Sequence, residues 1–388
     1  MKKLIRISTV PTSLNIFLKG QLEMLSEYYE VLAVSSPGLE LKELEEREKV
    51  RALAIQMERH ISLFSDFFSL VRLIKLFAKE RPYIVHSITP KAGFLAMVAA
   101  FITGVPIRIH TFTGLVFPTS TGRMQKLLIM MDRITCFCAT YINPEGEGVK
   151  NDLLQFRITS KPLHIIANGN VRGIDLNYYD HTQEVMEKVL KIRVQSTFTF
   201  CFVGRLVRDK GINELLAAFN KLYNREASIK LILVGAFEEK FGPLLPETIE
   251  WIKHHPGVMY VGRQQDVRPY LAISKVFVFP SYREGFPNGV LEAGAMGLPS
   301  IVTDINGSNE IIIPNENGII IPPRDEKSLL EAMDFLISHP EETKRMASNA
   351  RKLVASRYEQ KIVWSALLKV YQDLIKKSVI DVNILDTH

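Results

Sequence analysis

The chain has 388 residues, of which 47% are hydrophobic and 23% charged, and its formal net charge is +6. This length predicts two or three domains, each large enough to bury a core. The three cysteines form neither a C-x-x-C pair nor an even set, which excludes a disulfide framework, favours a reducing compartment and argues against a zinc site.

The N-terminal residues do not form a convincing targeting segment. Met1-Lys2-Lys3 is basic like the start of a signal peptide, but Arg6 interrupts the apolar residues that follow and Pro11 ends them, so a core strand is the better interpretation. The longest apolar run, residues 94–107, contains a glycine and a proline and is shorter than the roughly 18 to 20 residues of a membrane span. We therefore expect a chain that does not cross a membrane.

Apolar runs alternate with helical periodicity along the whole chain, which is typical of the α/β class with parallel sheets. In the first half we predict strands at residues 4–8, 31–35, 84–86, 107–111, 139–142 and 163–166. In the second half we predict strands at residues 198–204, 230–235, 258–262, 276–280, 300–303 and 318–321. The polar stretch 168–196 is the predicted connection between the halves, and a last helix is predicted at about 359–377.

Basic charge is concentrated in the first half. Residues 1–170 contain 21 Lys and Arg against 15 Asp and Glu, an excess equal to the net charge of the whole chain. This basic surface could bind an anionic acceptor or an anionic bilayer. Alternatively, it is a solvated surface without a partner. The stretch lacks a helix-turn-helix, zinc-finger or aromatic-basic reading motif, so we expect no nucleic-acid partner.

Two first-half segments combine basic and apolar side chains. At 62–79 the apolar residues, among them Phe64, Phe67 and Phe68, fall mostly on one broad face, and the stretch 122–138 is similar. Such a helix can lie in a bilayer interface, but it can equally cover a parallel sheet. The sequence leaves both interpretations open.

The first chemical motif follows the predicted strand at 198–204. Gly204, Arg205, Lys210 and Gly211 lie between this strand and a helix beginning near Asn213. Two cations at the carboxyl end of a parallel strand are placed to hold a diphosphate. The chain contains no P-loop and no G-x-G-x-x-G, so neither a P-loop kinase nor a dinucleotide dehydrogenase is supported.

The second motif, residues 277–293, is a short apolar strand, a Gly/Pro loop and a helix beginning near Asn288. Glu284 on the loop and Glu292 about one turn inside the helix are eight residues apart and can face one ligand. Carboxylates accept charge-assisted hydrogen bonds from the hydroxyl groups of a sugar and a ribose. The pair therefore indicates a sugar-nucleotide ligand.

Together the two motifs resemble the retaining glycosyltransferases of family 4, which have the GT-B fold. The resemblance is carried by G-R-x-x-x-x-K-G at 204–211 and E-G-F-P-x-x-x-x-E at 284–292. The blocks at 9–13 with 20–22, 86–93 and 110–114 resemble the bacterial subset that builds capsule, O-antigen or other lipid-linked glycans.

The resemblance implies two Rossmann-like domains with parallel sheets facing across a cleft. Residues 1–170, joined by a C-terminal helix at 359–388 that crosses back, would be the acceptor-binding domain, and residues 171–358 would bind the donor. The implied catalytic residues are His110, Arg205, Lys210 and Glu284. The implied donor-binding residues are Gly204, Arg205, Lys210, Gly262, Glu284, Gly285, Phe286, Pro287, Leu291 and Glu292. The implied acceptor-side residues are Thr12, Ser13, His86, Thr113 and Gly114.

In this interpretation Arg205 and Lys210 stabilise the leaving diphosphate. Glu284 holds the sugar, Glu292 holds the ribose, and His110 lies beside the transferred sugar. The resembled family needs no metal and no cofactor.

The sequence thus predicts a retaining, metal-independent glycosyltransferase. Its expected donor is a UDP-sugar such as UDP-GalNAc, UDP-GlcNAc or UDP-Gal, and its expected acceptor is an undecaprenyl-diphosphate-linked saccharide. We expect it in the cytoplasm, peripheral on the inner face of the bacterial cytoplasmic membrane and in contact with anionic lipid. A nonhydrolysing UDP-sugar epimerase of the same fold and a non-catalytic sugar-nucleotide-binding module are the alternatives.

Overall fold

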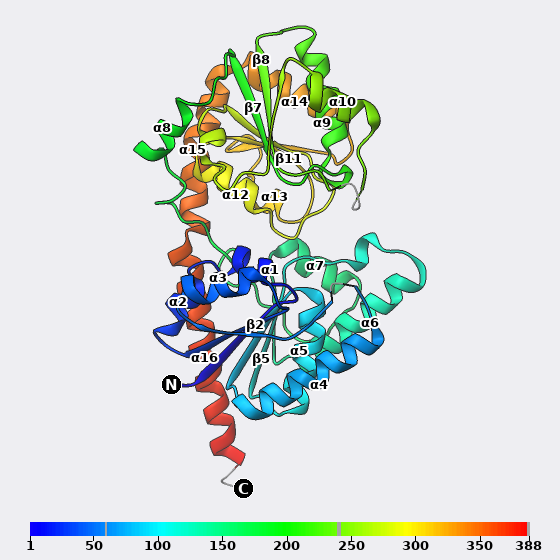
Figure 1. Cartoon of the computed structure of the whole chain (residues 1–388), viewed down its shortest axis with the longest axis vertical. Helices are drawn as coiled ribbons and strands as arrows, with labels where there is room; N and C mark the ends of the chain where they lie inside the picture. Colours follow the sequence, from blue (N-terminus) through cyan, green and yellow to red (C-terminus); the bar gives the residue numbers. More distant parts are fainter. Residues whose placement is uncertain (59, 239–241, 386–388) are drawn as a thin grey trace. The chain divides into compact units, whose positions relative to one another are not determined.

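The computed structural model describes residues 1–58, 60–238 and 242–385, which divide into two compact units (Figure 1). Unit 1 comprises Met1–Gly173 and Lys361–His388, and unit 2 comprises Ile174–Gln360. The boundaries expected from the sequence, at 170/171 and 358/359, lie slightly before these divisions.

Unit 1 is built on a parallel sheet of six strands within the described residues, in the order β3-β2-β1-β4-β5-β6. The strands are β1 (Lys3–Ile7), β2 (Glu30–Ser35), β3 (Arg51–Ala54), β4 (Ile84–Ile88), β5 (Ile107–Phe112) and β6 (Tyr141–Pro144). In β1, Leu4 lies opposite Val31 of β2 and Ile84 of β4. The strand order reverses between β1 and β4, and open α/β sheets bind ligands beside such a switch point.

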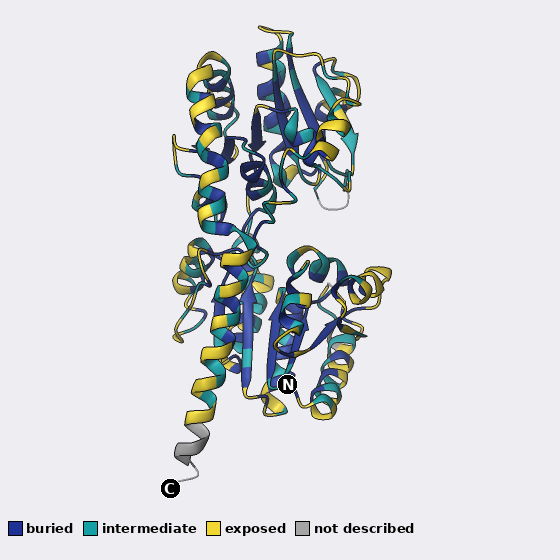
Figure 2. Cartoon of the chain, turned by 90° about the vertical axis from the view of Figure 1, so that its left-hand side faces the viewer, coloured by how far each residue is buried: buried dark blue, intermediate teal, exposed yellow. Residues whose placement is uncertain are grey.

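Helices cover both faces of this sheet. They are α1 (Pro11–Phe17), α2 (Gln21–Ser26), α3 (Leu39–Glu48), α4 (Leu63–Glu80), α5 (Pro90–Ile102), η1 (Phe117–Thr119), α6 (Gly122–Cys138), α7 (Glu147–Gln155) and α16 (Gln360–Leu385). Strand side chains alternate between two hydrophobic clusters, so Ile5 and Ile7 lie in one and Leu4 in the other. Because helices cover both faces, the central strands β1, β4 and β5 are buried along most of their length (Figure 2).

The C-terminal helix α16 belongs to unit 1 although it follows unit 2 in sequence. It packs Leu367 and Tyr371 into the cluster that contains Leu4. The expected return of this helix to the first domain is confirmed, and the helix continues past the predicted end at 377.

Unit 2 repeats the plan, with six parallel strands in its described part in the order β12-β11-β10-β7-β8-β9. They are β7 (Phe198–Val203), β8 (Ile229–Val234), β9 (Val258–Gly262), β10 (Val276–Phe279), β11 (Ser300–Thr303) and β12 (Gly318–Ile321). Its helices are α8 (Gln183–Val189), η2 (Arg208–Lys210), α9 (Ile212–Tyr223), α10 (Pro246–His254), α11 (Arg268–Ala272), α12 (Asn288–Ala295), α13 (Ser308–Ile311), α14 (Glu326–Ser338) and α15 (Pro340–Tyr358). Here the strand order reverses between β7 and β10, the two strands that precede the chemical motifs.

Three sequence-based predictions differ from the structure. The strand predicted at 163–166 is wrong: only an isolated bridge from Leu163 to Ile142 forms, because the Ile166 amide donates to the Asn143 side chain instead of continuing a ladder. The edge strand β3 was not predicted, since its four residues are exposed or half-buried and carry no apolar run. The predicted connection at 168–196 contains α8, and its residues from Ile174 onward belong to unit 2.

Candidate functional site

The two chemical motifs meet at the switch point of unit 2. The Tyr282 amide donates to the Asp209 carbonyl at 2.8 Å, which ties the loop after β10 to the loop after β7. Gly211 makes this approach possible: its φ is +69°, and a Cβ there would lie 2.1 Å from the Pro280 carbonyl oxygen. The sequence therefore needs glycine where the two loops touch.

Lys210 and Glu284 form an ion pair across these loops. Their side chains are only 15% and 17% exposed, and the Ser281 hydroxyl donates to the same Glu284 oxygen at 2.8 Å. The Lys210 ammonium also lies 5.1 Å from the centre of the Phe279 ring. The predicted phosphate-binding cation and the predicted sugar-binding acid are thus brought into direct contact.

Arg205 is held differently. Its side chain is 53% exposed and pairs with Glu238 at 2.9 Å. Exposed ion pairs of this kind contribute little to stability, so Arg205 can exchange Glu238 for a ligand oxygen at small cost.

The helix α12 begins directly after the loop of Glu284, with Pro287 preceding its first turn. The first-turn amides of a helix have no partner within the helix and favour negative charge. Glu292 is half-buried on the second turn. Burial, and to a lesser extent the charges of Asp266 and Glu292, raise the pKa of Tyr178, which places Glu292 within electrostatic reach of that phenol.

Several predicted donor residues have packed side chains. Phe286 is buried and meets Tyr358 edge to face, and Leu291 lies in the core of unit 2. Their proposed contacts to a donor can therefore come only from the backbone. Gly262 ends β9, and its carbonyl accepts from the Gly235 amide at 2.9 Å, at the same carboxyl edge of the sheet as Gly204.

His110 lies inside β5, within the strand predicted at 107–111, and its side chain is 1% exposed. Its Nδ1 is 2.8 Å from the Ser87 hydroxyl, and its ring meets Phe112 edge to face. Burial lowers the pKa of His110 to about 3, so the imidazole is neutral at physiological pH. A Cβ on Gly93 of α5 would lie 2.2 Å from the imidazole, so α5 fixes the ring.

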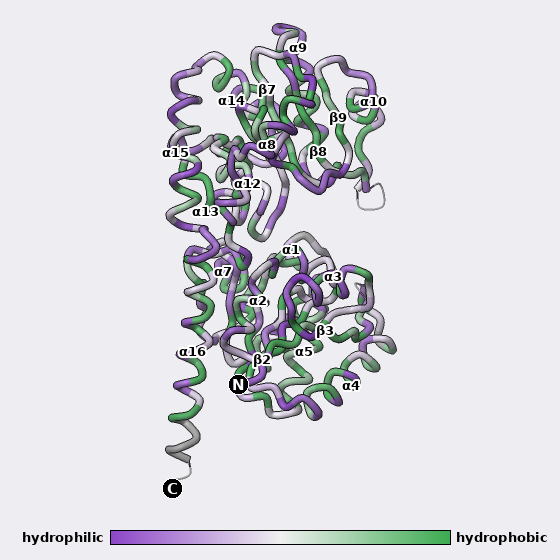
Figure 3. Tube along the Cα trace, turned by 60° about the vertical axis from the view of Figure 1, so that its left-hand side comes forward, coloured by the Kyte–Doolittle hydropathy of each residue, from purple (hydrophilic) through white to green (hydrophobic). Residues whose placement is uncertain are grey.

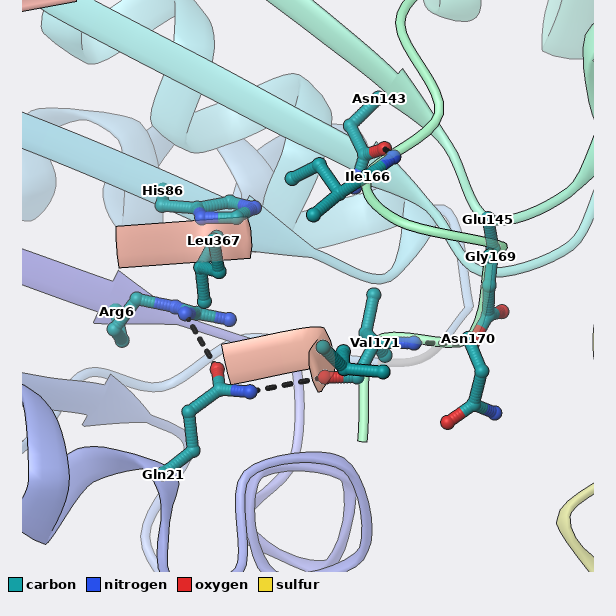
Figure 4. Close-up of a pocket in the computed structure, with 11 residues that line it drawn as sticks. Arg6, Gln21, His86, Asn143, Glu145, Ile166, Gly169, Asn170, Val171 and Leu367 are labelled. Atoms are coloured by element: carbon teal, nitrogen blue, oxygen red, sulfur yellow. Dashed lines mark hydrogen bonds between the residues drawn. The ribbon is translucent and has the colours of Figure 1, made fainter. Parts of the chain in front are cut away.

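His86 is 1% exposed, with both ring nitrogens occupied within unit 1. Nδ1 is 2.6 Å from the Tyr371 hydroxyl and Nε2 is 2.7 Å from the Thr111 hydroxyl. Buried Arg6 also reaches Tyr371, at 3.0 Å, and Gln21 at 2.8 Å. Arg6, Gln21 and His86 also line a small pocket of about 10 Å³ (Figure 4), which has room for roughly one water molecule. His86 can therefore influence an acceptor only through its neighbours.

The other acceptor-side candidates lie at the carboxyl edge of the unit 1 sheet. Thr12 and Ser13 are half-buried on the first turn of α1, and Thr113 and Gly114 are half-buried after β5. Of these four, Ser13 lines a cavity of about 370 Å³.

Two family models cover most of the chain. The model for glycosyl transferases group 1 matches residues 187–353, and a glycosyl transferase 4-like model matches residues 6–142. The capsular polysaccharide biosynthesis glycosyltransferase CapM of Staphylococcus aureus is 32% identical over 97% of this chain and 98% of its own length.

The chain belongs to the group 1 glycosyltransferases.

A second relative of this glycosyltransferase is the Escherichia coli UDP-Gal:alpha-D-GlcNAc-diphosphoundecaprenol alpha-1,3-galactosyltransferase, 29% identical over 74% of each chain. Among solved structures, Anabaena HepE in complex with UDP matches with a TM-score of 0.80 at 17% identity, over 96% of this chain and 100% of that one. The sucrose-phosphate synthase of Thermosynechococcus elongatus matches with a TM-score of 0.79 at 18% identity, over 97% and 100%. The predicted GT-B fold is confirmed.

Sequence reasoning missed two groups of this glycosyltransferase. The first is Ser281, whose hydroxyl donates a hydrogen bond to Glu284. Its position directly after a predicted strand could have identified it from the sequence. The second is Asp132 of α6, which lines the 370 Å³ cavity. It is the single acidic residue in a helix of apolar and basic residues, and this could have identified it from the sequence.

Proposed function

We propose that this glycosyltransferase moves a sugar from a UDP-sugar to an undecaprenyl-diphosphate-linked saccharide, with retention of anomeric configuration and without a metal. The observation that carries the proposal is the contact between Lys210 and Glu284 at the switch point of unit 2. A cation for phosphate and an acid for hydroxyl groups stand side by side where α/β sheets bind nucleotides.

The names of relatives support the choice of substrates. The Escherichia coli relative uses UDP-Gal and a diphosphoundecaprenol-linked GlcNAc. A Campylobacter jejuni relative, 30% identical over 45% of this chain, transfers N-acetylgalactosamine to a diphospho-undecaprenol-linked sugar. CapM is named for capsular polysaccharide biosynthesis, which fits surface polysaccharide as the product.

In the proposed reaction, negative charge grows on the diphosphate as it leaves. The Lys210 ammonium would bind both Glu284 and the diphosphate. The Arg205 guanidinium would exchange its ion pair with Glu238 for one with the diphosphate. Backbone groups of Gly285, Phe286 and the α12 start would bind the remaining phosphate oxygens. Interactions that strengthen as charge develops lower the barrier to reaction.

On the sugar side, Glu284 would accept hydrogen bonds from the sugar hydroxyls and Glu292 from the ribose. The family resemblance also assigns His110 to the transferred sugar. Because burial keeps the pKa of His110 far below neutrality, it would act there as a neutral hydrogen-bonding group and not as an acid.

We also propose that unit 1 contacts the inner face of the cytoplasmic membrane. Among the described residues no helix is both long and apolar enough to span a bilayer. On α4, however, Phe64, Phe67 and Phe68 are 85%, 61% and 59% exposed, whereas Leu73 and Phe77 are buried. The helix therefore covers the sheet with one face and exposes aromatic rings and the basic residues Arg72, Lys75 and Lys79 on the other. Figure 3 shows that hydrophobic and hydrophilic residues alternate along α4.

The decisive experiment incubates the full chain with a panel of UDP-sugars and undecaprenyl-diphosphate saccharides. Transfer with an anomeric configuration equal to that of the donor, read by NMR, supports the proposal, and inversion refutes retention. Interconversion of UDP-sugars without acceptor would identify an epimerase. Donor binding without turnover on any acceptor of the panel would identify a binding module.

The same assay tests metal independence. Activity should persist in EDTA, because side chains and a helix start carry the leaving-group charge in this proposal. Complete loss that Mg²⁺ restores would contradict it.

A further inference from the structure

A second site candidate is the cavity of about 370 Å³ in unit 1, whose size falls within the range of small-molecule pockets. Thr9 follows β1 and Thr89 follows β4, so the cavity lies beside the switch point of the unit 1 sheet. Ser13 of α1, Lys91 of α5 and Asp132 of α6 complete its polar lining. This is the position in unit 1 that corresponds to the motif loops of unit 2.

Asp132 is the unusual group in this lining. It is 8% exposed, and it has no hydrogen bond or ion pair with any residue in the part of the chain that the structure describes. An ionised carboxylate buried without a partner is costly, and burial raises the pKa of Asp132 to about 7.

The charged and titratable residues near Asp132 do not form a hydrogen bond or an ion pair with its carboxyl group. Lys91 of α5 lines the same cavity, but its ammonium is paired with Asp66 and donates to the His60 carbonyl at 2.7 Å. Cys136, one turn along α6, has its pKa raised to about 12 by burial and by the Asp132 charge, and remains a neutral thiol. Asp132 therefore turns its hydrogen-bonding capacity into the cavity, where either water or a bound ligand can supply the donors.

The rest of the lining specifies what kind of ligand would fit. The hydroxyls of Thr9, Ser13 and Thr89 can donate and accept, whereas Leu128 and Met131 of α6 add an apolar wall. A carbohydrate presents hydroxyl groups at its edge and C–H groups on its faces, so it matches both parts of the lining. A diphosphate does not, because it would meet an acid whose charge repels it.

We propose that this cavity binds the acceptor's terminal sugar and that Asp132 accepts a hydrogen bond from one of its hydroxyl groups. This inference rests on the proposed function, since it concerns the acceptor of that transfer.

The test variant is Asp132→Asn, which keeps the shape of the side chain and removes the buried charge, so folding is not impaired. With a donor and acceptor that wild type uses, KM for the acceptor should rise at least about 10-fold, and Kd for UDP should change less than about twofold. Glu46→Gln, on the exposed surface of the same unit, is the matched control and should change neither constant.

Deoxy acceptors identify the contact. In wild type, one deoxy position of the terminal sugar should raise KM about as much as Asp132→Asn does, and in the variant that same deoxy position should have little further effect. A second variant, Val116→Trp, places bulk at a 43% exposed wall of the cavity and should also raise KM for the acceptor without changing UDP binding.

The outcomes separate the two proposals. Failure of wild type to transfer to any lipid-linked saccharide would overturn the proposed function itself. Normal transfer by wild type, with unchanged acceptor KM in Asp132→Asn and in Val116→Trp, would overturn the acceptor cavity and leave the proposed function standing.

Discussion

At the scale of single residues, the contact between Lys210 and Glu284 has two consequences. It holds both side chains in place before any ligand arrives, and it leaves each dependent on the other, because removing one partner of a shielded pair exposes the second charge. Arg205 depends less on its partner, because the side chains of Arg205 and Glu238 are 53% and 37% exposed and water can solvate either charge. The two cations of one motif should therefore respond differently to mutation.

Lys210→Ala should lower kcat at least about 100-fold, the scale of removing one preorganised charge donor. It should also lower the free energy of unfolding by about 1 to 3 kcal/mol, because Glu284 loses its partner. Arg205→Ala should lower kcat similarly with a change in unfolding free energy below about 0.5 kcal/mol. For both variants, steady-state kinetics measure kcat and urea unfolding measures the free energy of unfolding. Lys344→Ala, at an exposed position, is the control. Full activity of either folded variant would remove that cation from the mechanism.

Substitutions of Glu284 and Glu292 should affect different steady-state kinetic constants. Ribose does not change during the reaction, so Glu292→Gln should mainly raise KM for the donor. Glu284 faces the sugar as positive charge develops, so Glu284→Gln should also lower kcat, and less so for a donor that lacks the contacted hydroxyl. If Glu284→Gln altered only KM and Glu292→Gln chiefly kcat, the assigned roles would be reversed.

At the scale of elements, helices place the two buried histidines of unit 1. The helix α5 presses Gly93 against His110, and α16 brings the Tyr371 hydroxyl to His86 and Arg6. The first contact is a close steric fit between a helix and a strand, whereas the second is a set of buried hydrogen bonds. The hydrogen bonds fix a unique arrangement because a buried polar group without its partner is costly.

Gly93→Ala tests the first contact. Alanine normally favours a helix by about 1 kcal/mol over glycine, but here the added methyl group would displace the His110 ring. We expect a net loss of about 1 to 3 kcal/mol in unfolding free energy and reduced kcat. In a His110→Ser background the methyl group has room, so Gly93→Ala should cost nothing there. An equal cost in both backgrounds would show that the ring is not the obstacle.

Tyr371→Phe tests the second contact. The change removes one hydroxyl group and keeps the ring in the core, leaving His86 Nδ1 and Arg6 short of a partner. The free energy of unfolding should fall by about 1 to 3 kcal/mol. Tyr28→Phe, at a 46% exposed ring, is the control and should have no measurable effect. Unchanged stability of Tyr371→Phe would mean that water replaces the hydroxyl without loss.

At the scale of the whole molecule, each unit carries its own parallel sheet, and the basic excess and the exposed phenylalanines of α4 both lie in unit 1. The two chemical motifs lie in unit 2. This division fits the proposed function, in which a nucleotide would bind one unit and a lipid-linked acceptor the other.

If α4 contacts the membrane, mutations on its exposed face should weaken vesicle binding without affecting UDP binding. Replacing Phe64, Phe67 and Phe68 by serine should weaken binding to vesicles that contain anionic phospholipid at least about 10-fold, because the rings would enter the interface. Binding of UDP should be unchanged. Leu39→Ser with Leu190→Ser removes other highly exposed apolar side chains and is the control. Cosedimentation equal to wild type in the triple variant would place the membrane contact elsewhere or exclude it.

The sequence by itself determined the family and, apart from β3 and the wrongly predicted strand at 163–166, the order of the strands. Parallel strands covered on both faces must be apolar runs, so β7 and β10 could be predicted from periodicity and length alone. The motifs that follow them could be assigned to one site, because the carboxyl ends of neighbouring parallel strands share one edge of a sheet. Short exposed segments such as β3 carry no such pattern, since their pairing depends on the neighbouring strand.

Only the tertiary structure decided which side chains meet. Nothing local in the sequence joins His86 to Tyr371, 285 residues away, and that contact turns a predicted acceptor residue into a core residue. Likewise, periodicity placed Phe64 and Phe77 on one helix but could not show that the first is 85% exposed and the second buried. Burial is a property of what the rest of the fold packs against a residue, so it is fixed by contacts between distant segments and not by local pattern.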